Sequence, residues 1–170
     1  MRSNRTKKIA LYGMCIAVAF LLSYLESIIP IQGLVPGMKL GLTNVVIVFA
    51  LYYLDAKAAF TINIVRMLLV GLTFGNLVSL CYSLAGGLLS FGTMFLLKKT
   101  GWFHMVTVSV VGSVCHNAGQ ILMAVLVLGT TAVGWYFGVL CISGVVAGVA
   151  VGILTGLVLQ KLPSYEELLK

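Results

Sequence analysis

Long apolar stretches, separated by short groups of polar, glycine or proline residues, make up most of the chain. These interruptions mark six candidate helices at about 8–26, 40–54, 57–74, 77–97, 104–128 and 132–160. An apolar helix of about 20 residues crosses the hydrocarbon core of a bilayer. The second and third candidates are short for a span, and the sixth is long enough to tilt or to extend past the bilayer. The pattern predicts an all-α polytopic membrane protein, a bundle of six transmembrane helices.

Composition supports a membrane protein over a soluble one. The 170 residues are 61% hydrophobic and 9% charged, with a mean hydropathy of +1.12. A soluble domain carries about 25% charged residues, and four acidic side chains cannot solvate the surface of so apolar a chain. Once the spans are counted, no length remains for a second domain. We therefore expect one integral membrane domain over residues 1–170.

The basic residues predict an orientation in the cell membrane. Membrane proteins carry an excess of Lys and Arg on their cytoplasmic side. With a cytoplasmic N-terminus, the residues on that side are Arg2, Arg5, Lys7, Lys8, Lys57, Lys98, Lys99, Lys161 and Lys170. Lys39 alone falls outside, and Arg66 lies within a span. Both termini are thus predicted to be cytoplasmic. The net charge is +7. We expect the basic residues to contact anionic membrane lipids rather than nucleic acid, because the sequence has no basic face with interleaved aromatic residues.

Residues 26–42, ESIIPIQGLVPGMKLGL, interrupt the helices with two prolines and three glycines yet remain largely apolar. Proline and glycine disfavour a continuous helix. A solvated loop would be more polar. We expect this segment to fold back over the outer face of the bundle as a cap, with an interfacial linker as the alternative.

Two helices carry small residues at regular spacing. In the last span, glycine recurs every fourth residue, at Gly144, Gly148, Gly152 and Gly156. That spacing lets another helix backbone approach closely, in the same chain or in a partner. The first span carries a weaker version near its cytoplasmic end, at Ala10, Gly13 and Ala17.

Arg66 is the most unusual residue, because it lies about eleven residues, or about 16 Å, into the third span. An arginine near the bilayer centre costs at least about 2.5 kcal/mol. None of the four acids lies at a span centre to neutralise it. Asn63 shares its helix face. Arg66 either bonds carbonyls and neutral polar groups as a structural residue, or it binds an anionic ligand.

The segment HNAGQ places His116, Asn117 and Gln120 at comparable depth in the fifth span. These residues either line a pocket or form a polar clamp between helices. A metal or haem site is not expected, because His104 lies about 18 Å away along the same helix.

Further polar residues fall toward the outer half of the predicted bundle. Lys39 and Asn44 lie at the outer end of the second span, Asn76 at the start of the fourth, and Glu26 at the end of the first. Together with Asn63, Arg66 and the HNAGQ residues, they predict a small-molecule pocket under the 26–42 segment. Lys39 and Arg66 outnumber Glu26, so the expected ligand is anionic with an apolar body. No cofactor is expected.

The segments VPGMKLGLTN, VRMLLVGL, SLAGGLLS and HNAGQ resemble the Gx transporter family, also called heptaprenyl diphosphate synthase component I. This family is similar to the S components of energy-coupling factor (ECF) transporters. The resemblance implies a six-helix substrate-binding subunit whose first external loop caps a pocket. It also implies docking of the first helix on a transmembrane coupling subunit that works with ATPases. Gly13 and Ala17 stand where those proteins typically have an Ala-x-x-x-Ala motif. Members of the family also occur in flavin- and quinone-dependent extracellular electron transfer.

Catalysis by this chain alone is not expected. Prenyl diphosphate synthases hold Mg²⁺ with paired Asp-rich motifs, and this sequence contains one aspartate, Asp55. It has no G-x-x-x-x-G-K-[ST] segment for ATP, so energy coupling would need partner subunits. Two functions follow: a substrate-binding transport subunit for a small anionic amphiphile, linked to isoprenoid, quinone or flavin metabolism, or a non-catalytic membrane component of a synthase or electron-transfer assembly.

Overall fold

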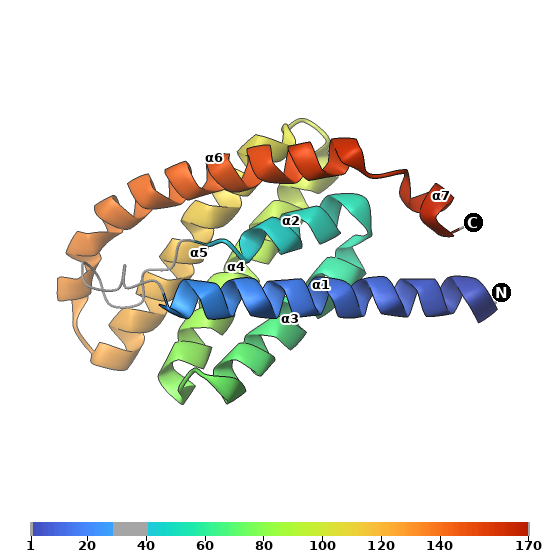
Figure 1. The fold of residues 1–170 in the computed structure, drawn as a ribbon. Helices are drawn as coiled ribbons and strands as arrows, with labels where there is room; N and C mark the ends of the chain where they lie inside the picture. The colour runs from blue at the N-terminus through green and yellow to red at the C-terminus, as the bar shows by residue number, and fades with distance from the viewer. Residues whose placement is uncertain (1, 29–40, 170) are drawn as a thin grey trace.

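A computed structural model describes residues 2–28 and 41–169, which form an all-helical bundle (Figure 1). The helices are α1 (Arg2–Ile28), α2 (Asn44–Tyr53), α3 (Ala56–Thr73), α4 (Leu77–Thr100), α5 (Met105–Leu128), the 3₁₀ helix η2 (Thr131–Tyr136), α6 (Phe137–Lys161) and α7 (Tyr165–Leu169). Within these residues, five helices, α1 and α3 to α6, are long and apolar enough to cross a membrane. The predicted fold class, a helical membrane bundle, is confirmed.

The second helix is shorter than the apolar pattern predicted. It begins at Asn44, just after Gly41, whose positive φ of 75° does not fit a right-handed helix. It ends at Tyr53, and Asp55 starts α3 by accepting a hydrogen bond from the Ala58 N–H at 2.7 Å. Its ten residues rise about 15 Å, or half the hydrocarbon core. A helix of this length is too short to cross the hydrocarbon core by itself.

The fifth helix lies between α4 and α6 and packs closely against both. On one side, a Cβ added to Gly119 would lie 2.8 Å from the Cα of Gly86 in α4. On the other side, a Cβ added to Gly148 of α6 would lie 2.5 Å from the Cα of Val110. Glycine at these contacts allows the backbones to approach, so α5 forms the centre of the α4–α5–α6 layer.

Both termini lie at one end of the bundle (Figure 1). The Tyr53 hydroxyl donates to the Pro163 carbonyl at 2.8 Å, which joins the α2–α3 turn to the segment after α6. The ammonium group of Lys98 donates to the carbonyl of Leu51, so the end of α4 reaches the same region. We call this the basic end; its exposed or half-buried lysines are Lys7, Lys8, Lys57, Lys98, Lys99 and Lys161.

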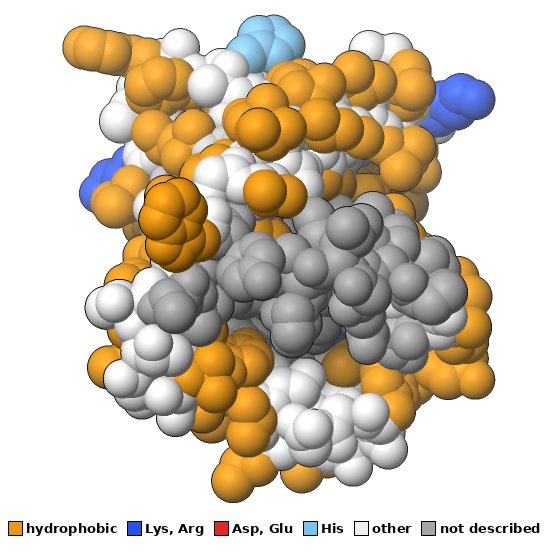
Figure 2. Space-filling model, turned by 90° about the vertical axis from the view of Figure 1, so that its left-hand side faces the viewer, with side chains coloured by type: hydrophobic (Ala, Val, Ile, Leu, Met, Phe, Trp, Pro, Cys, Tyr) orange, Lys and Arg blue, Asp and Glu red, His pale blue; other side chains and the backbone are white. Residues whose placement is uncertain are grey.

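The opposite end of the bundle is shown in Figure 2. Its described side chains are mainly hydrophobic, and most of the visible basic side chains lie at its margins. Residues 29–40, which include most of the predicted cap and Lys39, lie outside the described residues. The two ends of that segment are joined, because the Gly41 N–H donates to the Glu26 carboxylate.

Candidate functional site

A small polar pocket lies where the end of α1, the start of α2 and the middle of α3, α4 and α5 meet. Its lining residues are Glu26, Gly41, Thr43, Asn44, Arg66, Ser83 and His116. The enclosed space is about 20 Å³, enough for about one water molecule. Five segments of the chain thus bring polar groups to one place inside an apolar bundle.

Arg66 is buried and is held by Asn63, one turn earlier on α3. Its Nε and Nη2 atoms donate to Asn63 Oδ1 at 3.2 and 3.0 Å. The Asn63 amide donates in turn to the Gly87 carbonyl of α4 at 3.1 Å. Gly87 allows this approach because it has no side chain in the way: a Cβ there would lie 2.5 Å from Met67 Sδ. The guanidinium is therefore fixed in direction, with α4 as its support.

Glu26 supplies the negative charge that the span centres lack. The sequence suggested that no acid would lie deep enough to neutralise Arg66, and here the structure differs. The α1 helix continues to Ile28 and turns Glu26 onto its buried side. Its carboxylate lines the same pocket as Arg66 and interacts with it electrostatically. A carboxylate at a helix end can thus lie beside a guanidinium from the centre of another helix.

The entrance to α2 is tied to α1 next to this pair. Ser23 and Thr43 share a buried hydrogen bond of 2.9 Å between their hydroxyl oxygens. This bond and the one from Gly41 to Glu26 position the first turn of α2, so that Asn44 lies buried in the pocket wall. Asn44 and Arg66 therefore reach the pocket from helices that the sequence could not orient relative to each other.

His116 enters the pocket from α5 and is also buried. Its position follows from the close α4–α5 contact, because a Cβ added to Gly86 would lie 2.7 Å from the His116 carbonyl oxygen. His116, Asn44 and Arg66 are the predicted binding residues that the structure brings together around the cavity.

Two other residues of HNAGQ point elsewhere. The Asn117 amide donates to the Leu140 carbonyl of α6 at 2.7 Å, a buried bond between helices. Gln120 packs against α4, where its Cγ would lie 2.9 Å from a Cβ on Gly86. Neither lines the pocket. In this arrangement Asn117 has the geometry of the interhelical clamp that was the alternative reading of this segment.

Asn76 lies apart from the pocket. It is exposed and caps α4, with its side chain accepting a hydrogen bond from the Ser79 N–H at 2.7 Å. Ser83 of α4, which no sequence pattern singled out, also lines the cavity. Serine is weakly informative in an apolar helix, since its hydroxyl often bonds its own backbone.

The glycine stripe of α6 lies against α5 of the same chain. Cβ atoms built on Gly144, Gly148 and Gly152 would meet backbone atoms of α5 at 3.3 Å or less, and one on Gly156 would meet Met105 Cε at 3.2 Å. The stripe of α1 differs: Ala10, Gly13 and Ala17 are exposed, and a Cβ on Gly13 would meet nothing within 4 Å.

A known protein family matches most of the chain. Residues 15–158 match the family described as heptaprenyl diphosphate synthase component I. The chain belongs to this family. The match covers the second half of α1 and all of the pocket residues, so the polar pocket of this component I chain lies within the shared region. No curated protein and no solved structure matches the chain.

Proposed function

We propose that this component I chain is a substrate-binding membrane subunit, S-component-like, whose polar pocket receives the charged group of a small anionic amphiphile. The observation that carries the proposal is Arg66: a buried guanidinium, oriented by Asn63, at the wall of a cavity shared with Asn44 and His116. The planar fork of an arginine suits carboxylate or phosphate geometry. A ligand from isoprenoid, quinone or flavin metabolism fits this chemistry, with its apolar body toward the 26–42 segment.

Binding requires the pocket to enlarge. A cavity of about 20 Å³ cannot hold a phosphate or carboxylate group with its substituent. The Glu26 carboxylate, which interacts with Arg66 and accepts the Gly41 N–H, is the group that an entering anion would displace. The Glu26 carboxylate repels an entering anion, so loss of the Glu26–Gly41 bond would let the carboxylate move away and admit the anion. Asn44 and His116 would then offer polar contacts to the ligand.

The basic end is proposed to face the cytoplasm, with both termini, and the pocket the outer side of the cell membrane. The clustering of lysines there supports this orientation. The exposed face of α1 with Ala10, Gly13 and Ala17 would then be the surface that docks on a transmembrane coupling subunit with its ATPases.

A second function is favoured by the family description itself. A chain of the heptaprenyl diphosphate synthase component I family would serve as a non-catalytic membrane component of a synthase or of an electron-transfer assembly. The polar pocket would then be a structural cluster that fixes α1, α2 and α3.

Mass spectrometry of small molecules released from gently purified protein distinguishes the two functions. We expect an anionic amphiphile to be released from wild-type protein and from Asn117→Ala, whose side chain points to α6. We expect less of it from Asn63→Ala, which leaves Arg66 without its orienting acceptor. Stable co-purification with a synthase or redox subunit, with no such molecule from wild-type protein, would favour the second function.

A further inference from the structure

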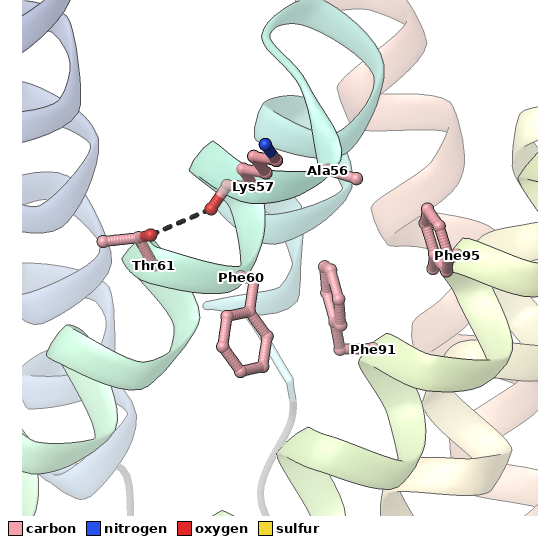
Figure 3. Close-up of a pocket in the computed structure, with 6 residues that line it drawn as sticks. All are labelled: Ala56, Lys57, Phe60, Thr61, Phe91 and Phe95. Carbon is pink, nitrogen blue, oxygen red and sulfur yellow. Dashed lines mark hydrogen bonds between the residues drawn. The ribbon is translucent and has the colours of Figure 1, made fainter.

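A second cavity lies between α3 and α4, near the basic end and apart from the polar pocket (Figure 3). It is an open groove of about 370 Å³, lined by Ala56, Lys57, Phe60, Thr61, Phe91 and Phe95. That volume is in the range of small-molecule sites. No part of the proposed function uses it.

The groove has an aromatic floor and wall. The rings of Phe60 and Phe91 meet across it, with centroids 5.4 Å apart, and Phe95 stacks beyond Phe91 at 6.3 Å. In Figure 3 the Phe60 and Phe91 rings lie side by side below Ala56, tilted relative to each other. Lys57 and Phe60 are three residues apart and Phe91 and Phe95 four, so the groove is about one helical turn, or 5 to 6 Å, deep along the helices.

One lysine lines the groove, and the spacing of residues along α4 places a second beyond it, toward the basic end. Lys57 is exposed and lines the groove. Lys99, also exposed, follows Phe91 and Phe95 at the same four-residue spacing and therefore continues their face of α4. Lys98 differs, because its ammonium group donates to the Leu51 carbonyl and lies 5.0 Å from the centre of the Tyr52 ring.

The nearby acid does not cancel both lysines. The Asp55 carboxylate caps α3 through the Ala58 N–H and interacts electrostatically with Lys98. The end of the groove that lies toward the basic end therefore keeps an excess of positive charge. The groove is apolar along its length and has cations at the end nearer the membrane interface. It therefore complements a molecule with an apolar chain and an anionic headgroup.

We propose that this groove binds an anionic phospholipid from the membrane leaflet at the basic end. Its phosphate lies between Lys57 and Lys99, and the first part of one acyl chain packs on Phe60, Phe91 and Phe95. Basic sites between transmembrane helices bind anionic headgroups in this way. This binding is independent of the Arg66 pocket, which lies on the other side of α3.

Native mass spectrometry of the full chain tests the proposal, with protein taken from nanodiscs of equal phosphatidylglycerol and phosphatidylcholine. Wild-type protein should retain phosphatidylglycerol in preference to phosphatidylcholine. In Lys57→Gln/Lys99→Gln this preference should fall about fivefold for each lysine. Lys161→Gln, which removes an exposed lysine at the same end but away from the groove, is the matched control and should keep it.

A second variant tests the groove itself. Ala56→Phe fills its mouth without changing charge, and it should reduce retention of phosphatidylglycerol at least as much as the double lysine variant. Equal phosphatidylglycerol preference in wild-type and Lys57→Gln/Lys99→Gln protein would overturn the proposal. So would lysine-dependent retention of added farnesyl diphosphate in place of phospholipid, or a dimer that Phe95→Ala dissociates, since these assign the groove to another occupant.

Discussion

The two sides of α5 differ in what surrounds their polar residues. Toward α6, Asn117 bonds the Leu140 carbonyl in a contact that glycine makes tight, with a Cβ on Gly144 lying 3.0 Å from the Asn117 amide nitrogen. Toward α3, His116 faces a cavity shared with Arg66 and Glu26. Adjacent residues of one apolar helix thus differ in whether space is left beside them. The difference teaches that polar residues at the same depth of one helix can have different roles, because packing leaves a cavity beside His116 and none beside Asn117.

The tight side should tolerate the least change. In Gly148→Leu, the new side chain must enter a space where a Cβ already lies 2.5 Å from the Val110 Cα. Backbone atoms cannot yield as a side chain does, so we expect a cost of more than about 3 kcal/mol and little folded protein. Folded yield and thermal unfolding in detergent measure this. Gly138→Leu, on the same helix but with nothing within 4 Å of its Cβ position, is the control and should behave as wild type. Equal yields for the two variants would contradict the tight α5–α6 contact.

Asn63→Ala tests the side that faces the cavity. It removes the acceptor of two Arg66 hydrogen bonds, and the guanidinium loses its fixed direction. We expect affinity for an anionic amphiphile to fall about tenfold, or about 1.4 kcal/mol. Titration calorimetry with farnesyl diphosphate and with 4-hydroxybenzoate measures it. Affinity equal to that of wild type for the probe that binds would show that the orientation of Arg66 is unimportant.

Asn117→Ala tests whether Asn117 serves as a clamp between α5 and α6 or as part of the binding site. Loss of one interhelical hydrogen bond in a membrane costs about 0.6 to 1.7 kcal/mol, so the thermal midpoint should fall by a few degrees. Probe affinity should remain unchanged, because Asn117 points to α6. A loss of affinity at unchanged stability would place Asn117 in the site instead.

The smallest effect is expected on α1. Gly13→Leu projects into open space, so the isolated chain should change stability by less than about 0.5 kcal/mol. If this face docks on a partner helix, the same variant should reduce co-purification of that partner from membranes. Unaltered co-purification would remove α1 as the docking surface.

The sequence predicted the helices well because apolar runs report burial in lipid directly. It placed α3, α4 and α5 within about three residues of their bounds, whereas α1 begins about six residues earlier and α6 about five residues later than predicted. It also singled out Arg66 and His116 by their depth. It could not show where α2 begins, since that depends on the positive φ of Gly41 and on the bonds from Glu26 and Ser23.

Side-chain direction was the second limit. The spacing of His116, Asn117 and Gln120 suggests a single polar cluster. The positions of α4 and α6 show that the three side chains instead have different surroundings. Glu26 and Arg66 likewise interact although they are 40 residues apart in the sequence, and no local pattern encodes such an interaction.

The central claim is that Arg66 binds an anion, and Arg66→Gln tests it most directly. Calorimetry with farnesyl diphosphate and 4-hydroxybenzoate should be run on folded wild-type, Arg66→Gln and Asn117→Ala protein. We expect a probe that binds the wild type and Asn117→Ala equally and binds Arg66→Gln more weakly by about 1.5 to 3 kcal/mol, the value of a lost charged hydrogen bond. Undiminished affinity in folded Arg66→Gln would contradict the account and leave Arg66, with Asn63 and Glu26, as a structural cluster.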